Sequence, residues 1–492
     1  ENAWVSFFTY APRIGAAIFA DWVQALPNLT WIQGEQLVAM LTDRDSENRH
    51  RRRRDRITGA QFTHTIVHAQ ITLEGTELGE GLALGDVPYR WGWDTDSPGT
   101  EPSLRQAQRR PDFPELCQRY PVQAPTWVVV MQDYGTGAIA PQQQAPSLTS
   151  SSTLPSRFQG AWDGYGKAAF WRYGRLPGER AMINWPQCGN DYGENLDQLV
   201  GTPSDRAAWH QAAWEHSARF AHWIQTHLGD RYGLATDTFP QSDDRLGGGA
   251  FALQPYYRES RRLRGLTTIW EPDILPQPGG QVAALPRLAS GEVSAIAIGN
   301  YPNDHHYPGV DFPLAPKAIR WGGRWTGTPF TIPYGAIVPA TVDGLLVCEK
   351  NISVSHMANG ATRLQPVVMG IGQAAGMAAA LCIEQRCQPR DLPVRSLQSA
   401  LLTDPIAPTA VIPLFNSQPQ DPDWRDWQEL YLQSPDRYPT TGYCPRRATP
   451  RHNPHLPDLH HWRGILTYDA AGSPRLQVQG IDVRAGDVRA ED

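Results

Sequence analysis

The stretch VVMGIGQAAGMAAALCIE at residues 367–384 constrains the chain more than any other, because it is long, apolar and rich in small residues. A membrane span needs about 20 apolar residues. Here Gln373 interrupts the run, and most of its members are the weakly apolar Gly and Ala. We therefore expect no membrane partner. A GxxxG dimer face depends on the lipid setting, so the remaining interpretation is a helix whose small residues let another group approach its backbone.

The charge and composition of the chain exclude other classes. At 492 residues it can form two or three domains. A net charge of −6 gives no basic face for nucleic acid, and the basic run NRHRRRRDR (48–56) is interpreted as a solvated loop. The 18 Trp, 44 Gly and 43 Pro residues indicate a loop-rich globular enzyme or binding protein.

The six cysteines indicate a reducing compartment. They include no CxxC pair, and no His or Cys group has zinc-finger spacing, so we expect reduced buried thiols, no metal and a cytoplasmic protein. The first residues, ENAWVSFFTY, lack the basic start and apolar core of a signal peptide. They also lack an initiator Met, and the chain is therefore expected to be a fragment or a processed product.

Periodicity predicts the main elements. Apolar residues at three- and four-residue steps predict helices over 11–26 and 203–228, and a further helix over 394–402. Alternation predicts one strand over 64–73 that runs into a Gly-rich turn, with other strands at 126–131 and 344–348 and a small β-like tail after 461. The run PQQQAPSLTSSSTLP at 141–155 is predicted to be a loop.

The small residues of 367–384 are predicted to open a helix. Gly and Ala side chains would leave the first-turn N–H groups accessible, and the helix dipole would add partial positive charge there. That end suits an anionic or electron-rich edge of a ligand. A tightly packed core helix is the alternative.

The run IPYGAIVPATVDGLLVCEKNISVSHMANGATRLQPVVMGIGQAAGMAAAL (332–381) resembles the C-terminal flavin-binding segment of a family of FAD-dependent oxidoreductases. Four further stretches agree with that family: 73–92, 183–193, 255–265 and 301–309. The resemblance covers roughly residues 2–390. Two departures stand out: the chain has no strand–GxGxxG–helix unit, and Glu349–Lys350 replaces a family Gly-Arg pair.

The resemblance implies an α/β fold with two domains, like glutathione reductase. Residues 1–93 and 331–390 would form a dinucleotide-type FAD-binding domain without its N-terminal βαβ unit. Residues 94–330 would be an inserted α+β substrate domain, and 391–492 a small C-terminal extension. Because the βαβ unit holds the ADP half of FAD, the chain is expected to be truncated and, alone, to hold FAD weakly.

The resemblance also implies site residues. FAD would be held non-covalently, with the backbone at Gly372–Gln373–Ala374 facing the pyrimidine side of the flavin. The cofactor-binding set is Gly75, Thr76, Asn351, Ser353, His356, Gly372, Gln373, Ala374 and Gly376. Arg258 and Glu259, in YYRESRR, are interpreted as a substrate anchor or as part of a structural ion-pair network. His305 and His306 are interpreted as a proton-transfer group or as a structural pair.

The function implied is transfer of a hydride from a small organic substrate to flavin. Polyols, sugars, amines and unsaturated lipids all stay open as substrates, and so does the oligomeric state. The alternative is a non-enzymatic carbohydrate-binding protein that stacks sugar rings on aromatic residues such as Trp91, Trp93, Tyr256 and Tyr257, for which core packing is the ordinary explanation.

Overall fold

The computed structural model describes residues 9–43, 54–95, 101–143, 157–241, 245–309, 318–319, 328–445, 465–468, 474–478 and 481–484. The chain divides into two compact units, Glu1–Cys444 and Pro445–Asp492. The basic run at 48–56 and the predicted loop at 141–155 lie largely outside the described residues. Residues 391–444 of the predicted extension belong to the first unit, while the other predicted domain boundaries stay predictions.

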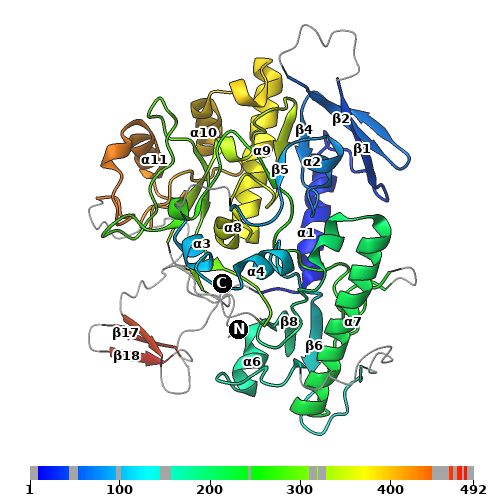
Figure 1. The fold of residues 1–492 in the computed structure, drawn as a ribbon. Helices are drawn as coiled ribbons and strands as arrows, with labels where there is room; N and C mark the ends of the chain where they lie inside the picture. Colours follow the sequence, from blue (N-terminus) through cyan, green and yellow to red (C-terminus); the bar gives the residue numbers. More distant parts are fainter. Residues whose placement is uncertain are drawn as a thin grey trace. The chain divides into compact units, whose positions relative to one another are not determined.

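Two short parallel strands form a small sheet in the first unit, and Figure 1 labels one of them, β4. β4 (Thr72–Glu74) pairs in parallel with β15 (Leu345–Val347), with Leu73 opposite Leu346. Side chains of Leu345, Leu346 and Val347 are fully buried, which is why an uninterrupted apolar run forms this strand. Because the strands are parallel, both carboxyl ends lie at the same edge.

The predicted single strand at 64–73 is wrong. The structure divides it between β3 (Ile66–His68) and β4, which belong to different sheets. β3 closes an antiparallel meander with β1 (Leu37–Thr42) and β2 (Ile57–Phe62), and all three of its residues are exposed. Alternation therefore did not mark one buried face here.

A four-stranded antiparallel sheet forms another part of the unit. Its order is β7 (Arg175–Leu176), β8 (Arg180–Ile183), β6 (Val129–Asp133) and β9 (Tyr232–Leu234). The long helix α7 (Pro203–Leu228) contacts β6 and β9, as Figure 1 shows in green. Its buried face, including Trp209, Phe220 and Ile224, joins a second hydrophobic core formed by residues between 78 and 257 together with Tyr307 and Met357.

A capping box fixes the start of α7. The Thr202 side chain accepts the Asp205 backbone N–H at 3.2 Å, and the Asp205 carboxylate accepts the Thr202 N–H at 2.9 Å. We expect Thr202→Ala to lower the free energy of unfolding by about 1 kcal/mol, measured by urea denaturation. Thr226→Ala, in the exposed last turn of the same helix, is the control, and an equal effect of both substitutions would contradict the capping role.

Helix α9 (Gln365–Gln385) contains the small-residue stretch, but it begins earlier than predicted. Gly372, Gln373 and Ala374 lie in its third turn, where backbone N–H groups bond to carbonyls four residues back. The predicted first-turn accessibility of these N–H groups is therefore wrong. Length and composition alone would let α9 cross a membrane, which is weak evidence, and its face with Val367, Ile371 and Ala374 is buried against the core.

The first hydrophobic core extends from residues between 40 and 87 to residues between 263 and 444. It includes α9, α10 (Val394–Thr403) and α11 (Trp424–Gln433). The remaining helices and strands of the unit are α2 (Glu80–Leu84), β5 (Tyr89–Arg90), α3 (Pro102–Ala107), α4 (Phe113–Arg119), α6 (Lys167–Tyr173), β10 (Arg262–Leu263), β11 (Ala295–Gly299), β12 (Asn303–Asp304), β13 (Ala318–Ile319), β14 (Phe330–Pro333) and α8 (His356–Thr362). Short 3-10 helices occur at Leu196–Val200, Glu271–Ile274, Tyr334–Ala336, Pro389–Asp391 and Pro435–Arg437.

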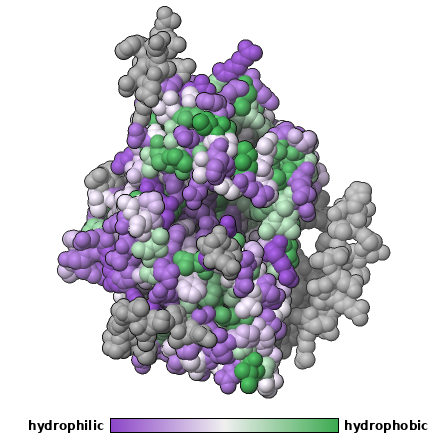
Figure 2. Space-filling model, turned by 90° about the vertical axis from the view of Figure 1, so that its right-hand side faces the viewer, coloured by the Kyte–Doolittle hydropathy of each residue, from purple (hydrophilic) through white to green (hydrophobic). Residues whose placement is uncertain are grey.

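Helix α1 (Pro12–Ala25) forms where predicted, yet none of its residues is buried. Ile14, Ile18 and Trp22, the predicted inward face, are each about half exposed. On the face of the molecule in Figure 2, apolar side chains (green) gather in patches separated by hydrophilic ones (purple).

The second unit contains one antiparallel sheet in its described residues. β17 (Pro474–Val478) is the central strand, between β16 (Ile465–Tyr468) and β18 (Ile481–Arg484). This confirms the predicted β-like tail.

Candidate active site

The carboxyl ends of β4 and β15 bring three distant segments together. Gly75 follows β4, and a Cβ atom added to it would lie 3.0 Å from the Cys348 Sγ. A Cβ atom added to Gly372 of α9 would lie 3.6 Å from the Cys348 carbonyl oxygen. Cys348, which the sequence did not single out, therefore separates two of the predicted cofactor residues. We call Gly75, Thr76, Cys348, Asn351 and Gly372 the strand-end site.

A buried carboxylate organises the polar members of the strand-end site. Glu74 accepts the Thr76 backbone N–H at 3.0 Å and the Asn351 amide at 3.4 Å. Burial raises the pKa of Glu74, although these hydrogen bonds oppose the shift. The Asn351 Oδ1 atom is buried and accepts no hydrogen bond from the described residues. A buried acceptor in this position needs a donor.

The other predicted cofactor residues either contact other parts of the protein or face open space. The Gln373 amide donates to the Ala407 carbonyl at 2.7 Å, and Ser353 Oγ lies 3.0 Å from Thr268 Oγ1. Ala374 is buried in the core. No described atom lies within 4 Å of a Cβ added to Gly376, so the tightly packed helix is not the explanation for this glycine.

Lys350, where the family has Arg, is nearly fully buried. Its Nζ lies 2.7 Å from the Glu349 carboxylate and 2.5 Å from that of Glu77. Burial alone would lower the pKa of Lys350, but the two carboxylates outweigh it and raise the pKa. The Glu349–Lys350 departure thus forms a local ion cluster beside the strand-end site.

The predicted catalytic residues lie in two buried polar chains. The first chain links Asp94, Arg262, Glu259, His356, Tyr307 and His305. Arg262 lies 2.8 Å from Asp94 Oδ2 and 3.0 Å from Glu259 Oε1, although its Nε–H is not aimed at the latter oxygen. Glu259 Oε1 is 2.9 Å from His356 Nδ1, and His356 Nε2 is 2.7 Å from the Tyr307 hydroxyl.

The far end of the first chain is His305. Its Nδ1 lies 3.1 Å from the Tyr307 hydroxyl, and its Nε2 lies 3.0 Å from the Met357 carbonyl oxygen. Burial, together with the nearby His356, lowers the pKa of His305 to about 3. His305 is therefore neutral near pH 7 and cannot itself be a general acid there.

The second polar chain links Arg258, Asp191, His306, Asp304, Arg363 and Tyr256. His306 lies between two carboxylates, 2.6 Å from Asp191 Oδ2 and 3.1 Å from Asp304 Oδ2. Arg258 Nη2 is 3.1 Å from Asp191 Oδ1, and Arg363 Nη2 is 3.2 Å from Asp304 Oδ2. Both ring nitrogens of His306 thus lie within hydrogen-bond distance of a carboxylate oxygen.

Cations control the acidity of the second chain. Burial alone would raise the pKa of Asp191, but Arg258 and His306 outweigh it and lower the pKa to about 2. The pKa of Asp304 is lowered in the same way by His306 and Arg363, against burial. Both carboxylates are therefore ionised near neutral pH.

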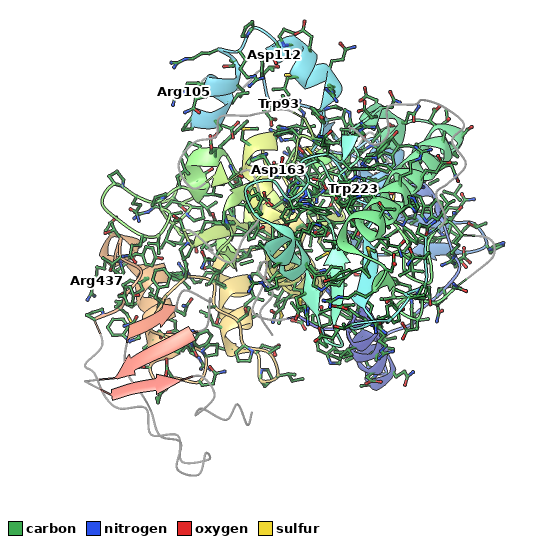
Figure 3. All side chains as sticks on the ribbon, turned by 90° about the horizontal axis from the view of Figure 1, so that it is seen from below. Trp93, Arg105, Asp112, Asp163, Trp223 and Arg437 are labelled. Atoms are coloured by element: carbon green, nitrogen blue, oxygen red, sulfur yellow. The ribbon has the colours of Figure 1, made fainter. Side chains whose placement is uncertain are left out.

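Local sequence explains how the two chains are held in place. Ser355 caps α8 by accepting the Ala358 N–H at 3.0 Å, and Asp94 accepts the His356 N–H at 2.7 Å. The indole of Trp93 packs on the imidazole of His356 with ring centroids 4.4 Å apart. Figure 3 shows Trp93 beneath the helices α3 and α4, next to α8.

A buried carboxyl, Glu101, fastens the segment before α8. It accepts hydrogen bonds from the Glu271 backbone N–H and from the Ser355 hydroxyl. Burial raises the pKa of Glu101 to about 7 despite those bonds.

The structure thus unites Arg258, Glu259, His305 and His306 with His356 in one buried region, and their catalytic roles stay predictions. Sequence reasoning missed several partners, namely Asp94, Asp191, Asp304, Tyr307 and Arg363. All of these except Asp94 lie in stretches that resemble the family, which was the available signal. No group of three or more His, Cys, Asp or Glu residues within the described ranges could hold a metal.

The family model described as FAD dependent oxidoreductase matches residues 1–401. The chain belongs to this family. Neither the curated proteins nor the solved structures compared with it gave a match.

The strand-end site of this FAD-dependent oxidoreductase fits the flavin end of the cofactor. The buried, unpartnered Oδ1 of Asn351 can accept a hydrogen bond from a polar ligand edge. Gly372 and Gly376 leave the surface of α9 without side chains, and open space lies over Gly376. An edge formed by two parallel strand ends is where open α/β sheets bind ligands.

The cysteines of the oxidoreductase are all free thiols. Cys382 and Cys444 are buried as predicted, whereas Cys188 is exposed, which corrects the expectation for that residue. Burial raises the pKa of the Cys348 thiol to about 11, and Glu74 and Glu349 add to the shift. Cys348 is therefore a neutral packing residue at the strand-end site near pH 7.

Proposed function

We propose that this oxidoreductase binds FAD non-covalently at the strand-end site and oxidises a small organic molecule. When bound, the flavin supplies a hydride acceptor. The observation that carries the proposal is the meeting of Gly75, Cys348 and Gly372 at the parallel strand ends, next to an unpartnered Asn351 oxygen. Two proposals accompany it: the protein works in the cytoplasm, and it needs no nucleic-acid or membrane partner.

Hydrogen-bond counting sets the direction of the hydrogen bonds in the first polar chain. Neutral His305 has one N–H, which must face the Met357 carbonyl, so its Nδ1 accepts the Tyr307 hydroxyl proton. The Tyr307 oxygen is then left to accept from His356 Nε2, and His356 Nδ1 lies 2.9 Å from Glu259 Oε1. His356 is therefore held between a hydroxyl and a carboxylate.

The proposal gives the four predicted catalytic residues supporting roles. Glu259 orients His356, and Arg262 and Asp94 hold Glu259 in turn. His305 fixes the direction of the Tyr307 hydroxyl. Arg258 and His306 hold Asp191 in the neighbouring chain.

The carbohydrate-binding alternative is not favoured. It needs aromatic faces that are open to sugar rings. Trp93 and Tyr257 are instead buried in the second hydrophobic core, and Arg258 lies over the ring of Tyr256.

Cofactor content tests the proposal directly. The purified chain, titrated with FAD at equilibrium, should quench flavin fluorescence saturably. Acid denaturation should release all of that flavin into solution, because the bond is non-covalent. Failure of added FAD to bind would overturn the proposed function.

Gly372→Val tests the location of the flavin. A Cβ at Gly372 would make only ordinary contact with Cys348, so the fold should tolerate the change and the thermal midpoint should move little. Overpacking costs about 1–3 kcal/mol, which predicts FAD binding weaker by about tenfold to 100-fold. Ala380→Val, exposed on the same helix, should bind FAD like the wild type. Equal FAD affinity of both variants would count against this location.

A further inference from the structure

A cavity of about 440 Å³ lies between α1 and the four-stranded sheet. Gly15, Ala16 and Phe19 of α1 line one side, and Val130 and Met182 of the sheet line the other. The volume lies in the range of small-molecule pockets, roughly 300–1,000 Å³. It suits a molecule of one to three rings, or a chain of similar size.

No charged side chain lines this cavity within the part of the chain that the structure describes. Its walls are mainly aliphatic and aromatic, and its polar groups are few: Thr9, Gln365 and the hydroxyls of Tyr10 and Tyr173. An ion placed there would lose hydration without gaining a counter-ion. A sugar or polyol would leave most of its hydroxyls without partners, at a cost of about 1–3 kcal/mol for each buried one.

The polar chains do not line the cavity, but two of its lining residues connect it to the second chain. Tyr173 lines it, and the electrostatic influence of Asp304, Arg258 and Arg363 reaches the same phenol. Gln365, the first residue of α9, also lines it and follows Arg363 by two positions. The end of the cavity that carries these two polar side chains therefore lies toward the second polar chain.

We propose that this cavity is the substrate pocket and that it takes a neutral, mainly apolar molecule with one hydrogen-bonding group. The proposal rests on the proposed function, which it deepens by choosing among substrate classes. Aromatic or aliphatic alcohols fit the walls, whereas sugars and polyols do not. The polar group of the substrate lies at the end formed by Tyr173 and Gln365, and the apolar part lies against Phe19 and Met182.

A neutral fluorescent probe, N-phenyl-1-naphthylamine, tests the pocket without any turnover. The purified chain should bind it saturably at one site. Ala16→Trp places a large side chain in the cavity from an exposed helix position and should lower the affinity for the probe at least tenfold. Ala17→Trp, equally exposed on the same helix but outside the cavity lining, is the matched control and should bind like the wild type.

Competition separates the substrate classes. 2-Naphthalenemethanol should displace the probe, and glucose and glycerol should not. Unchanged probe affinity in Ala16→Trp, equal loss in both Trp variants, or displacement by glucose would each overturn the assignment.

Measuring the probe on flavin-free and FAD-loaded protein keeps the two proposals distinguishable. If FAD never binds but the probe follows the expected pattern, the pocket stands and the proposed function fails. If FAD binds and Gly372→Val weakens FAD binding, but Ala16→Trp leaves the probe affinity unchanged, only the pocket assignment fails.

Discussion

Arg262→Met is expected to destabilise the protein by about 3–5 kcal/mol, the cost of removing one partner from a buried ion pair. The Arg262 side chain is fully buried and contacts the carboxylates of both Asp94 and Glu259. Methionine has a similar length but no charge, so two buried carboxylates would remain without their shared cation. Urea unfolding followed by circular dichroism measures the change in the free energy of unfolding.

Arg287→Met is the matched control for this substitution. Arg287 pairs with Asp436 at 2.7 Å, but the pair lies on the surface, with 40% and 87% of the two side chains exposed. Exposed pairs contribute about 0–1 kcal/mol. If both Met variants unfold at the wild-type urea concentration, the first polar chain does not stabilise the fold as described. Glu259→Gln should partly restore the stability of Arg262→Met, because it removes one of the two carboxylates that lost Arg262.

Acidification from about pH 6.5 to pH 4.5 is expected to destabilise the protein through its buried histidines. Burial, with His356, lowers the pKa of His305 to about 3, and burial, with Arg157, lowers that of His216 to about 4. An unfolded histidine titrates near pH 6.5. Between about pH 6.5 and pH 4 these histidines therefore bind protons in the unfolded chain but not in the folded chain. Each histidine lowers the free energy of unfolding by at most about 1.4 kcal/mol per pH unit.

Glu101 acts in the opposite direction. Burial raises the pKa of Glu101 in the folded chain from its ordinary value of 4.5 to about 7, so its stabilising contribution is complete at low pH and is lost as the pH rises through 7. Between about pH 4.5 and pH 7, the change in the free energy of unfolding due to Glu101 cancels that of about one histidine. The net loss from about pH 6.5 to pH 4.5 is thus on the order of 2–3 kcal/mol.

Urea midpoints over that pH range measure this effect. His305→Asn and His216→Gln should each reduce the fall of the urea midpoint with falling pH. His64→Asn, whose side chain is 76% exposed, is the control and should leave it unchanged. A pH-independent wild-type midpoint over this range would contradict the assignment of neutral, buried histidines.

Elements with strong local signals were predictable. The helix at 203–228 was confirmed as α7, because Pro203 and Gly229 mark its ends and Thr202 caps it. The buried strand within 344–348 was confirmed as β15, and the helix at 394–402 as α10. In each case the residues that decide the structure lie within the element or next to it.

Features set by distant partners were not predictable. The pattern at 64–73 is continuous in sequence, but β3 pairs with β2 while β4 pairs with β15, more than 250 residues away. The residues of RESRR were recognised as a charge group, whereas their partners Asp94 and Asp191 come from loops that carry no periodic signal. The start of α9 was misplaced because the small residues such as Gly370 and Gly372 were taken to open the helix. The helix in fact begins at Gln365, with Pro366 in its first turn.

The lack of any buried residue in α1 has a consequence for the kinetics of ligand entry. An isolated helix of 14 residues is marginal in water, so α1 belongs to the part of the chain with the lowest local opening free energy. The sheet on the other side of the cavity, with Val130 almost fully buried, opens only with the global transition. Fraying of α1 therefore gives a molecule a path to the cavity that leaves the sheet, α7 and both polar chains folded.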